Sequence, residues 1–144
     1  MKKITASLDE LDKVASYMYE SIPSNAIIFL RGDLASGKTT LTQAIAKAKG
    51  IHSSVTSPTF SLQHCYGEGL YHYDLYRISH DEFMQLGLFE EFEKDGWHII
   101  EWGSNELESF LKSVDYDIYI VDIEVADDRR KYTIKSSNAQ TSSQ

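Results

Sequence analysis

The sequence predicts one α/β domain in which helices flank a mixed sheet that includes an antiparallel hairpin. Short apolar runs, typical of buried strands, alternate with stretches of helical periodicity. A glycine-rich segment joins the first such run to the next helix, and three residues separate two later strand-like segments. With 144 residues, 42% of them hydrophobic, the chain can bury one core. We expect residues 1–135 to form the domain and the polar residues 136–144 to be a disordered tail.

The charge balance limits which partners the protein can bind by itself. The formal net charge is −8, and the chain contains only four arginines, Arg31, Arg77, Arg129 and Arg130. Because phosphate contacts require clusters of Lys and Arg, we expect no autonomous nucleic-acid binding. Cys65 is the only cysteine, which excludes an internal disulfide and suits a reducing cytosol. No apolar run approaches the length of a membrane span, so a cytoplasmic protein is expected.

The first predicted elements are an amphipathic helix and a buried strand. Ser7 and Glu10 form an S-x-x-E capping box at the start of the helix. Apolar residues then recur at helical spacing through about Ser21; they are Leu8, Leu11, Val14, Ala15 and Met18. Pro23 ends this pattern, and residues 26–30 form a continuous apolar block typical of a buried parallel strand.

The segment after this strand matches the phosphate-loop pattern G-x-x-x-x-G-K-[ST] without a mismatch. Its residues are Gly32, Asp33, Leu34, Ala35, Ser36, Gly37, Lys38 and Thr39. The glycines permit a close backbone approach to phosphate oxygens, Lys38 supplies a charge for the β/γ-phosphates, and the Thr39 hydroxyl can ligate Mg²⁺. Residues 41–49 favour a helix that Gly50 ends. We therefore predict nucleotide binding on a P-loop NTPase-like sheet, against the alternative of a glycine-rich turn without a ligand.

Two candidate site residues lie in the next part of the chain. Thr59 follows a proline in a hydroxyl-rich loop, which is either an ordinary loop or a mobile one that meets a γ-phosphate and Mg²⁺. Residues 60–66 and 70–75 are expected to pair as a hairpin. Asp74 ends the second strand. It is either a turn-former with Arg77 as a surface partner, or the residue that holds a metal-bound or attacking water, and the sequence leaves both open.

The second half of the expected site is an apolar strand, residues 97–101, that ends in a carboxylate. We expect this strand beside the phosphate-loop strand, where Glu101 would reach Mg²⁺ or its water shell; the alternative is a surface acid. A second capping box, at residues 79–82, opens a short helix before this strand. A helix over residues 104–112 and strands over residues 116–125 and 129–134 complete the prediction.

Four motifs, taken in order, resemble the TsaE family, the bacterial ATPases of tRNA threonylcarbamoyladenosine biosynthesis. They are Gly32-Asp33-Leu34 with Gly37-Lys38-Thr39-Thr40, Ser57-Pro58-Thr59-Phe60, Asp74-Leu75-Tyr76-Arg77 and Ile100-Glu101-Trp102. The resemblance runs from about residue 7 to residue 134. It departs at Ala35-Ser36, where the family usually has Gly-Ala.

The resemblance implies a subunit that binds and hydrolyses ATP with Mg²⁺ and acts with two partner proteins of the threonylcarbamoyl-transferase complex. It assigns residues 32–40 and Arg129 to the nucleotide, Thr39 and Glu101 to the metal, and Asp74, Glu101 and Thr59 to catalysis. The acidic charge suggests that the partners would hold the tRNA, and the small number of arginines suggests that hydrolysis by the isolated subunit would be slow. The alternatives are a small-molecule kinase with a phosphate loop and a non-catalytic ATP-binding interaction module.

Overall fold

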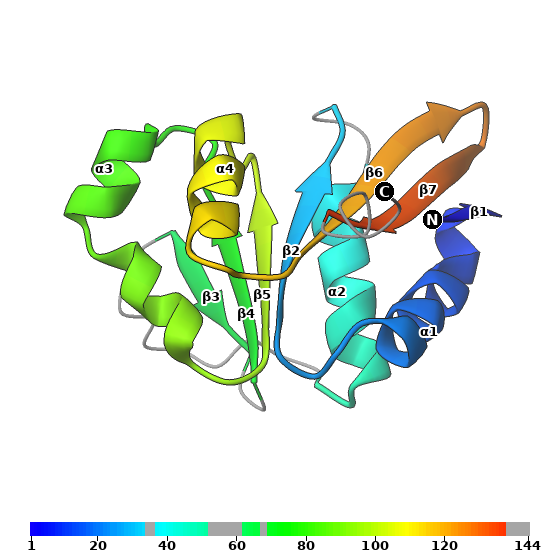
Figure 1. Ribbon diagram of the computed structural model, residues 1–144. Helices are drawn as coiled ribbons and strands as arrows, with labels where there is room; N and C mark the ends of the chain where they lie inside the picture. Colours follow the sequence, from blue (N-terminus) through cyan, green and yellow to red (C-terminus); the bar gives the residue numbers. More distant parts are fainter. Residues whose placement is uncertain (34–36, 52–61, 67–68, 138–144) are drawn as a thin grey trace, which may run out of the picture.

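The computed structural model describes residues 1–33, 37–51, 62–66 and 69–137, which form a seven-stranded mixed sheet between two layers of helices (Figure 1). The strands, in sheet order, are β1 (Lys2–Ala6), β7 (Arg129–Ser136), β6 (Ile118–Ala126), β2 (Ala26–Arg31), β5 (Trp97–Glu101), β4 (Leu70–Asp74) and β3 (Gln63–Cys65). Strands β6, β2, β5 and β4 are parallel to one another, and the other three pair antiparallel. The predicted α/β fold with an antiparallel hairpin is therefore confirmed.

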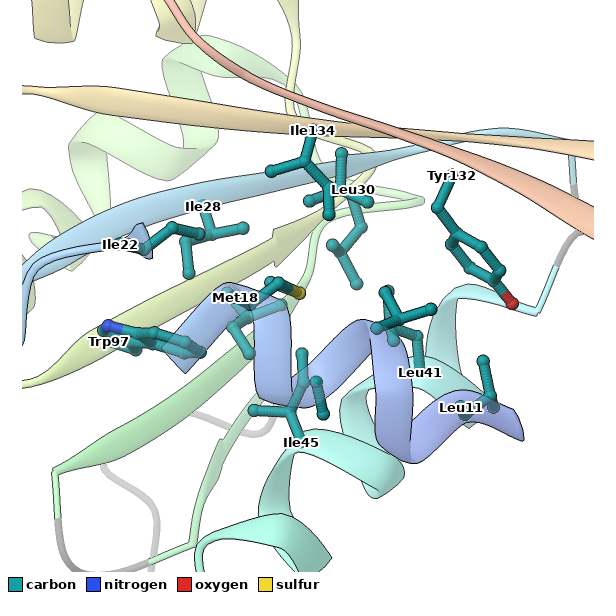
Figure 2. Packing of buried hydrophobic residues seen from close by; sticks show 14 of the residues in the cluster. Leu11, Met18, Ile22, Ile28, Leu30, Leu41, Ile45, Trp97, Tyr132 and Ile134 are labelled. Carbon is teal, nitrogen blue, oxygen red and sulfur yellow. The ribbon is translucent and has the colours of Figure 1, made fainter. Parts of the chain in front are cut away.

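The helices divide the core into two clusters, one on each face of the sheet (Figure 1). The helical elements are η1 (Leu8–Glu10), α1 (Leu11–Ser21), α2 (Lys38–Ala48), α3 (His80–Gln85), η3 (Leu88–Glu93) and α4 (Asn105–Ser113). Side chains of α1 and α2 pack on one face, and those of α3, η3 and α4 pack on the other. Figure 2 shows the first cluster, in which Met18 of α1 and Leu41 and Ile45 of α2 lie beside Ile28 and Leu30 of β2.

The central strand β2 is buried on both faces, as its continuous apolar sequence predicts. Ile28 and Leu30 belong to the cluster under α1 and α2, whereas Ile27 and Phe29 belong to the opposite cluster. This division follows from the alternation of side chains along a strand. The strand is consequently held from both sides just before the chain enters the phosphate loop.

Both predicted capping boxes are present. Ser79 and Glu82 exchange hydrogen bonds of 3.1 and 3.2 Å and open α3. Ser7 and Glu10 form the other box, but it opens the 3₁₀ turn η1, and α1 begins only at Leu11. The helix expected to start at the box is therefore divided into two segments.

One strand and one boundary differ from the sequence predictions. Strand β1 was not predicted, because it is an edge strand whose lysines are exposed and of which only Ala6 is fully buried. At the other end, β7 includes Ser136, and the Ser137 N–H donates to the Ile118 carbonyl at 2.8 Å. The pairing thus extends into the segment that was expected to begin the tail.

None of the helices in the described residues is long and apolar enough to span a bilayer.

Candidate active site

The parallel strands bring several of the predicted site residues to one edge of the sheet. Strand β2 runs into the phosphate loop, and its Leu30 lies opposite Glu101 of β5. Asp74, at the end of β4, lies opposite Glu101 on the other side. A cavity of about 410 Å³ opens at this edge. It is lined by Gly37, Lys38, Thr39, Thr40, Asp74, Tyr76, Glu101 and Trp102. The predicted neighbour relation between β2 and β5 is confirmed.

Lys38, the phosphate-loop lysine, lies almost fully buried at the start of α2. Its Nζ donates to the carbonyl oxygens of Gly32 at 2.7 Å and Asp33 at 3.0 Å. Burial lowers the pKa of its ammonium, and the nearby carboxylates of Glu101 and Asp33 oppose that shift. Gly37, at φ 99°, adopts the left-handed conformation that lets α2 begin here. Lys38 and the first turn of α2 thus line the same cavity, an arrangement suited to phosphate.

Glu101 is 4% exposed and forms hydrogen bonds with two side chains. The Thr39 hydroxyl lies 3.1 Å from Oε2, and His72 Nε2 lies 2.5 Å from the same oxygen. Burial raises the pKa of the Glu101 carboxyl, but the bonds from His72 and Thr39, together with the charge of Lys38, bring it below the ordinary value. Glu101 is therefore a buried carboxylate in its ionised form.

The chemistry of Thr39 and Glu101 fits Mg²⁺. Because the Thr39 hydroxyl donates a hydrogen bond to Glu101, the lone pairs of the Thr39 oxygen are left for a cation. Mg²⁺ prefers oxygen ligands and keeps several of its waters when bound. The described residues contain no group of three or more His, Cys, Asp or Glu side chains that could hold a metal without help. Such a site would therefore depend on phosphate oxygens of a nucleotide for further ligands.

The sequence left open whether Asp74 forms a turn or holds a water at the site, and its position is compatible with both. Its Oδ1 accepts a hydrogen bond of 3.1 Å from the Tyr76 N–H, which is the geometry of an Asx turn. The residue is nevertheless exposed in the wall of the cavity, next to Glu101 in register. Arg77, the proposed surface partner, lies over the Tyr76 ring at 5.8 Å.

Some predicted residues are not described by the structure, and two arginines lie away from the cavity. Leu34, Ala35, Ser36 and Thr59 fall outside the described residues. Arg129 begins β7 and forms a 3.0 Å ion pair with Glu10, and it is not among the residues that line the cavity. Arg31 forms a 2.8 Å ion pair with Glu108 of α4. In the described part of the chain, the cavity wall therefore contains a lysine but no arginine.

The sequence analysis did not identify two residues that lie at the site. His72 contacts Glu101 from the neighbouring strand; the available signal was its place two residues before Asp74, on the same face of β4. Trp102 follows Glu101 and has a left-handed backbone at φ 63°. Its ring lies 4.1 Å from Lys38 Nζ and 4.9 Å from the Tyr76 ring. The tryptophan thus forms an aromatic wall beside the lysine.

Comparison with known proteins identifies the family. A family model described as "Threonylcarbamoyl adenosine biosynthesis protein TsaE" matches residues 5–132. A relative from Bacillus subtilis, named tRNA threonylcarbamoyladenosine biosynthesis protein TsaE, is 37% identical over 71% of this chain. A relative of the same name from Rickettsia felis is 34% identical over 94% of this chain and 79% of its own length.

The coverage of some relatives is incomplete. The match spans 66% of the Bacillus subtilis protein and 66% of a Haemophilus influenzae relative, slightly less than two thirds of each. A solved structure titled "Crystal structure of Bacillus subtilus YdiB" superposes with a TM-score of 0.67 at 25% identity, covering 99% of this chain and 90% of that one. The family match and the similar architecture agree with the geometry at the strand ends, and the chain belongs to the TsaE family.

Proposed function

We propose that this protein binds and hydrolyses ATP with Mg²⁺ as a cytoplasmic subunit of the machinery that makes threonylcarbamoyladenosine in tRNA. The observation that carries the proposal is the convergence of Lys38, Thr39 and Glu101 at one end of the central strands. A surface acid would not be almost fully buried against the hydroxyl of a phosphate-loop threonine. The names of the relatives support the pathway.

In this proposal, some residues of the cavity bind the nucleotide and the metal, and Asp74 assists the chemical step. Lys38 exchanges the carbonyls of Gly32 and Asp33 for phosphate oxygens, and the first N–H groups of α2 complete the cradle. Thr39 and Glu101 hold Mg²⁺, which when bound neutralises phosphate charge. Asp74 lines the cavity from the strand adjacent to β5, where its second carboxylate oxygen can orient an attacking water. Thr59 and Arg129 remain proposed contributors on the basis of the family resemblance.

A partner requirement follows from the composition of the cavity wall. A cation that reaches the γ-phosphate in the transition state contributes about 10³–10⁵ in rate to phosphate-loop hydrolysis. Among the described residues, Arg31 and Arg129 are engaged with Glu108 and Glu10 rather than lining the cavity. We therefore propose that hydrolysis is slow in the isolated protein and that two partner subunits complete the site. With a net charge of −8, this chain would leave the tRNA to those partners.

Steady-state ATP hydrolysis, measured with and without the purified threonylcarbamoyl-transferase partners, tests the proposal. The partners should raise turnover at least about tenfold, a modest part of the range for such activation. Thr39→Ala should abolish the increase, and Asp74→Ala should reduce it strongly. Thr133→Ala, on β7, is a control for loss of a threonine hydroxyl and should behave as the wild type. Rapid hydrolysis by the isolated protein, unaffected by any partner, would instead favour the kinase alternative.

A further inference from the structure

The further inference concerns His72, whose contacts are unusual for a buried histidine. The side chain is 4% exposed in the middle of β4, and its Nε2 lies 2.5 Å from Glu101 Oε2. The other ring nitrogen, Nδ1, is buried and has no hydrogen-bond partner among the described residues. Buried polar atoms are nearly always paired, so an unsatisfied nitrogen needs an explanation. Glu101 is thus the polar group that determines the orientation of this ring.

The strand register explains why these two side chains meet. His72 lies opposite Ile99 in the parallel pair of β4 and β5. Glu101 follows two residues after Ile99 and therefore points to the same face. The His72 ring also stacks on His64 of β3, with 5.6 Å between ring centroids. The contact therefore depends on sheet pairing and not on a mobile loop.

The hydrogen bonds on Glu101 are unevenly distributed between its two oxygens. Oε2 accepts from His72 at 2.5 Å and from Thr39 at 3.1 Å, whereas Oε1 makes only a 3.4 Å contact with Thr39 within the described part of the chain. Two donors converging on one oxygen fix the rotation of the carboxylate. They also keep the hydroxyl hydrogen of Thr39 pointed at Glu101, which leaves the lone pairs of the Thr39 oxygen for a cation.

We propose that His72 is a positioning residue that orients Glu101, and through it Thr39, for the Mg²⁺ of the nucleotide complex. This inference rests on the proposed function, because the orientation matters only if Thr39 and Glu101 serve that metal. Partners that orient metal-associated carboxylates change metal affinity by about 10–100-fold when they are removed.

The test measures metal-dependent nucleotide binding and does not rely on turnover. In His72→Phe the ring remains and the donor is lost, whereas in His72→Gln an amide nitrogen stands near the place of Nε2. Calorimetric titration with ADP, in EDTA and at increasing Mg²⁺, gives the affinity for the nucleotide and for the metal. Mn²⁺ in place of Mg²⁺ allows bound metal to be counted by electron paramagnetic resonance.

We expect His72→Phe to weaken metal binding in the ADP complex by about 10–100-fold and to leave ADP affinity in EDTA unchanged. His72→Gln should recover most of the metal affinity. His64→Phe is the matched control, since it alters the stacked neighbour without touching Glu101, and it should bind metal as the wild type does. If His72→Phe does not fold, the pair His72→Gln and His72→Asn carries the test, because the shorter amide cannot reach Oε2.

A double-mutant cycle separates positioning from a general structural role. On a Glu101→Gln background, His72→Phe should cause no additional loss of metal affinity, because the residue acts through Glu101. Wild-type metal affinity in His72→Phe, failure of His72→Gln to recover it, or an additional loss in the double mutant would each overturn the inference. If one of these results is obtained while the wild-type protein binds ADP and metal, only the inference about His72 is wrong and the proposed function is retained. If the wild-type protein binds no nucleotide, the proposed function and the inference are both wrong.

Discussion

Two buried histidines on adjacent strands, His72 on β4 and His98 on β5, show how a candidate ligand site differs from a structural polar cluster. His98 uses both ring nitrogens: Nδ1 lies 2.8 Å from the Tyr73 hydroxyl, and Nε2 lies 2.8 Å from the Lys94 carbonyl. Because a carbonyl can only accept, Nε2 carries the proton and the Tyr73 hydroxyl donates to Nδ1. Within the described residues, His72 by contrast has one hydrogen-bond partner, Glu101, and its Nδ1 has none.

The surroundings of the two clusters differ in the same sense. The His98 cluster continues to Gln63, whose Nε2 lies 3.3 Å from the Tyr73 hydroxyl and 2.9 Å from Glu91 Oε1. It lies among the apolar residues under η3, where Phe92 packs edge-on against the His98 ring. The His72 cluster instead ends at the cavity containing Lys38 and Thr39. Both clusters contain an unpaired buried atom, since Gln63 Oε1 has no partner among the described residues, and His98 also borders a cavity. What distinguishes the His72 cluster is that the cavity where it ends contains the lysine and the threonine of the phosphate loop.

The largest expected effect of a substitution is on the cavity side. Lys38→Ala should weaken ATP and ADP binding by about 10–150-fold, because a charge-assisted hydrogen bond contributes roughly 1.5–3 kcal/mol. Calorimetric titration measures the affinity. Lys47→Ala, at the exposed far end of α2, is the control and should leave the affinity unchanged. Equal affinities for Lys38→Ala and the wild type would remove the cavity from consideration as a phosphate site.

On the structural side, Tyr73→Phe should lower the free energy of unfolding by about 1–3 kcal/mol, because His98 Nδ1 loses its buried donor. Nucleotide affinity should not change. Urea unfolding and ADP titration of the same variant give the two quantities. Tyr71→Phe provides the comparison, since Tyr71 stacks on His98 through a ring that the substitution retains. A Tyr73→Phe protein that loses nucleotide affinity would show that the two clusters are coupled.

The pH dependence of stability should reflect His98. Burial lowers the pKa of its imidazole, although the Lys94 carbonyl and the Glu91 charge oppose that shift. Above the pKa of about 6.5 that a histidine has in the unfolded chain, His98 is neutral in both the folded and the unfolded protein. Its contribution to the free energy of unfolding is then at its maximum. As pH falls below that value, the unfolded chain gains a proton that the folded chain does not, so stability declines until the folded pKa is reached. Nitrogen NMR of the His98 ring should show the neutral Nε2–H form near pH 6; an imidazolium there would contradict the assignment.

The smallest effect should come from the exposed margin of the structural cluster. Lys94 forms a 2.9 Å ion pair with Glu91, but its side chain is 47% exposed. Lys94→Met should therefore change the free energy of unfolding by no more than about 0.2–1 kcal/mol. Urea unfolding beside Tyr73→Phe measures the difference. A larger loss than in Tyr73→Phe would place the stabilising interaction at the surface and not in the buried network.

The sequence by itself determined the features that depend on neighbouring residues. The phosphate-loop residues of the described segment, the strand and helix on either side of them, both capping boxes and the hairpin follow from patterns a few residues long. Such patterns encode backbone conformation directly, since glycine, capping and periodicity rules act over one or two turns. Glu101 was predicted because a strand end next to a phosphate loop is a natural position for a metal-associated acid.

Only the tertiary structure decided which side chains complete the site. His72 and Glu101 are 29 residues apart and meet because β4 and β5 are parallel neighbours in one particular register. The period of two in a strand predicts which residues share a face, but it does not specify the neighbouring strand or the register. The pairing of Arg31 with Glu108 and of Arg129 with Glu10 likewise depends on how α4 and η1 pack. These contacts arise from the packing of whole elements, whose arrangement minimises exposed apolar surface across the entire domain and is not encoded in any local segment.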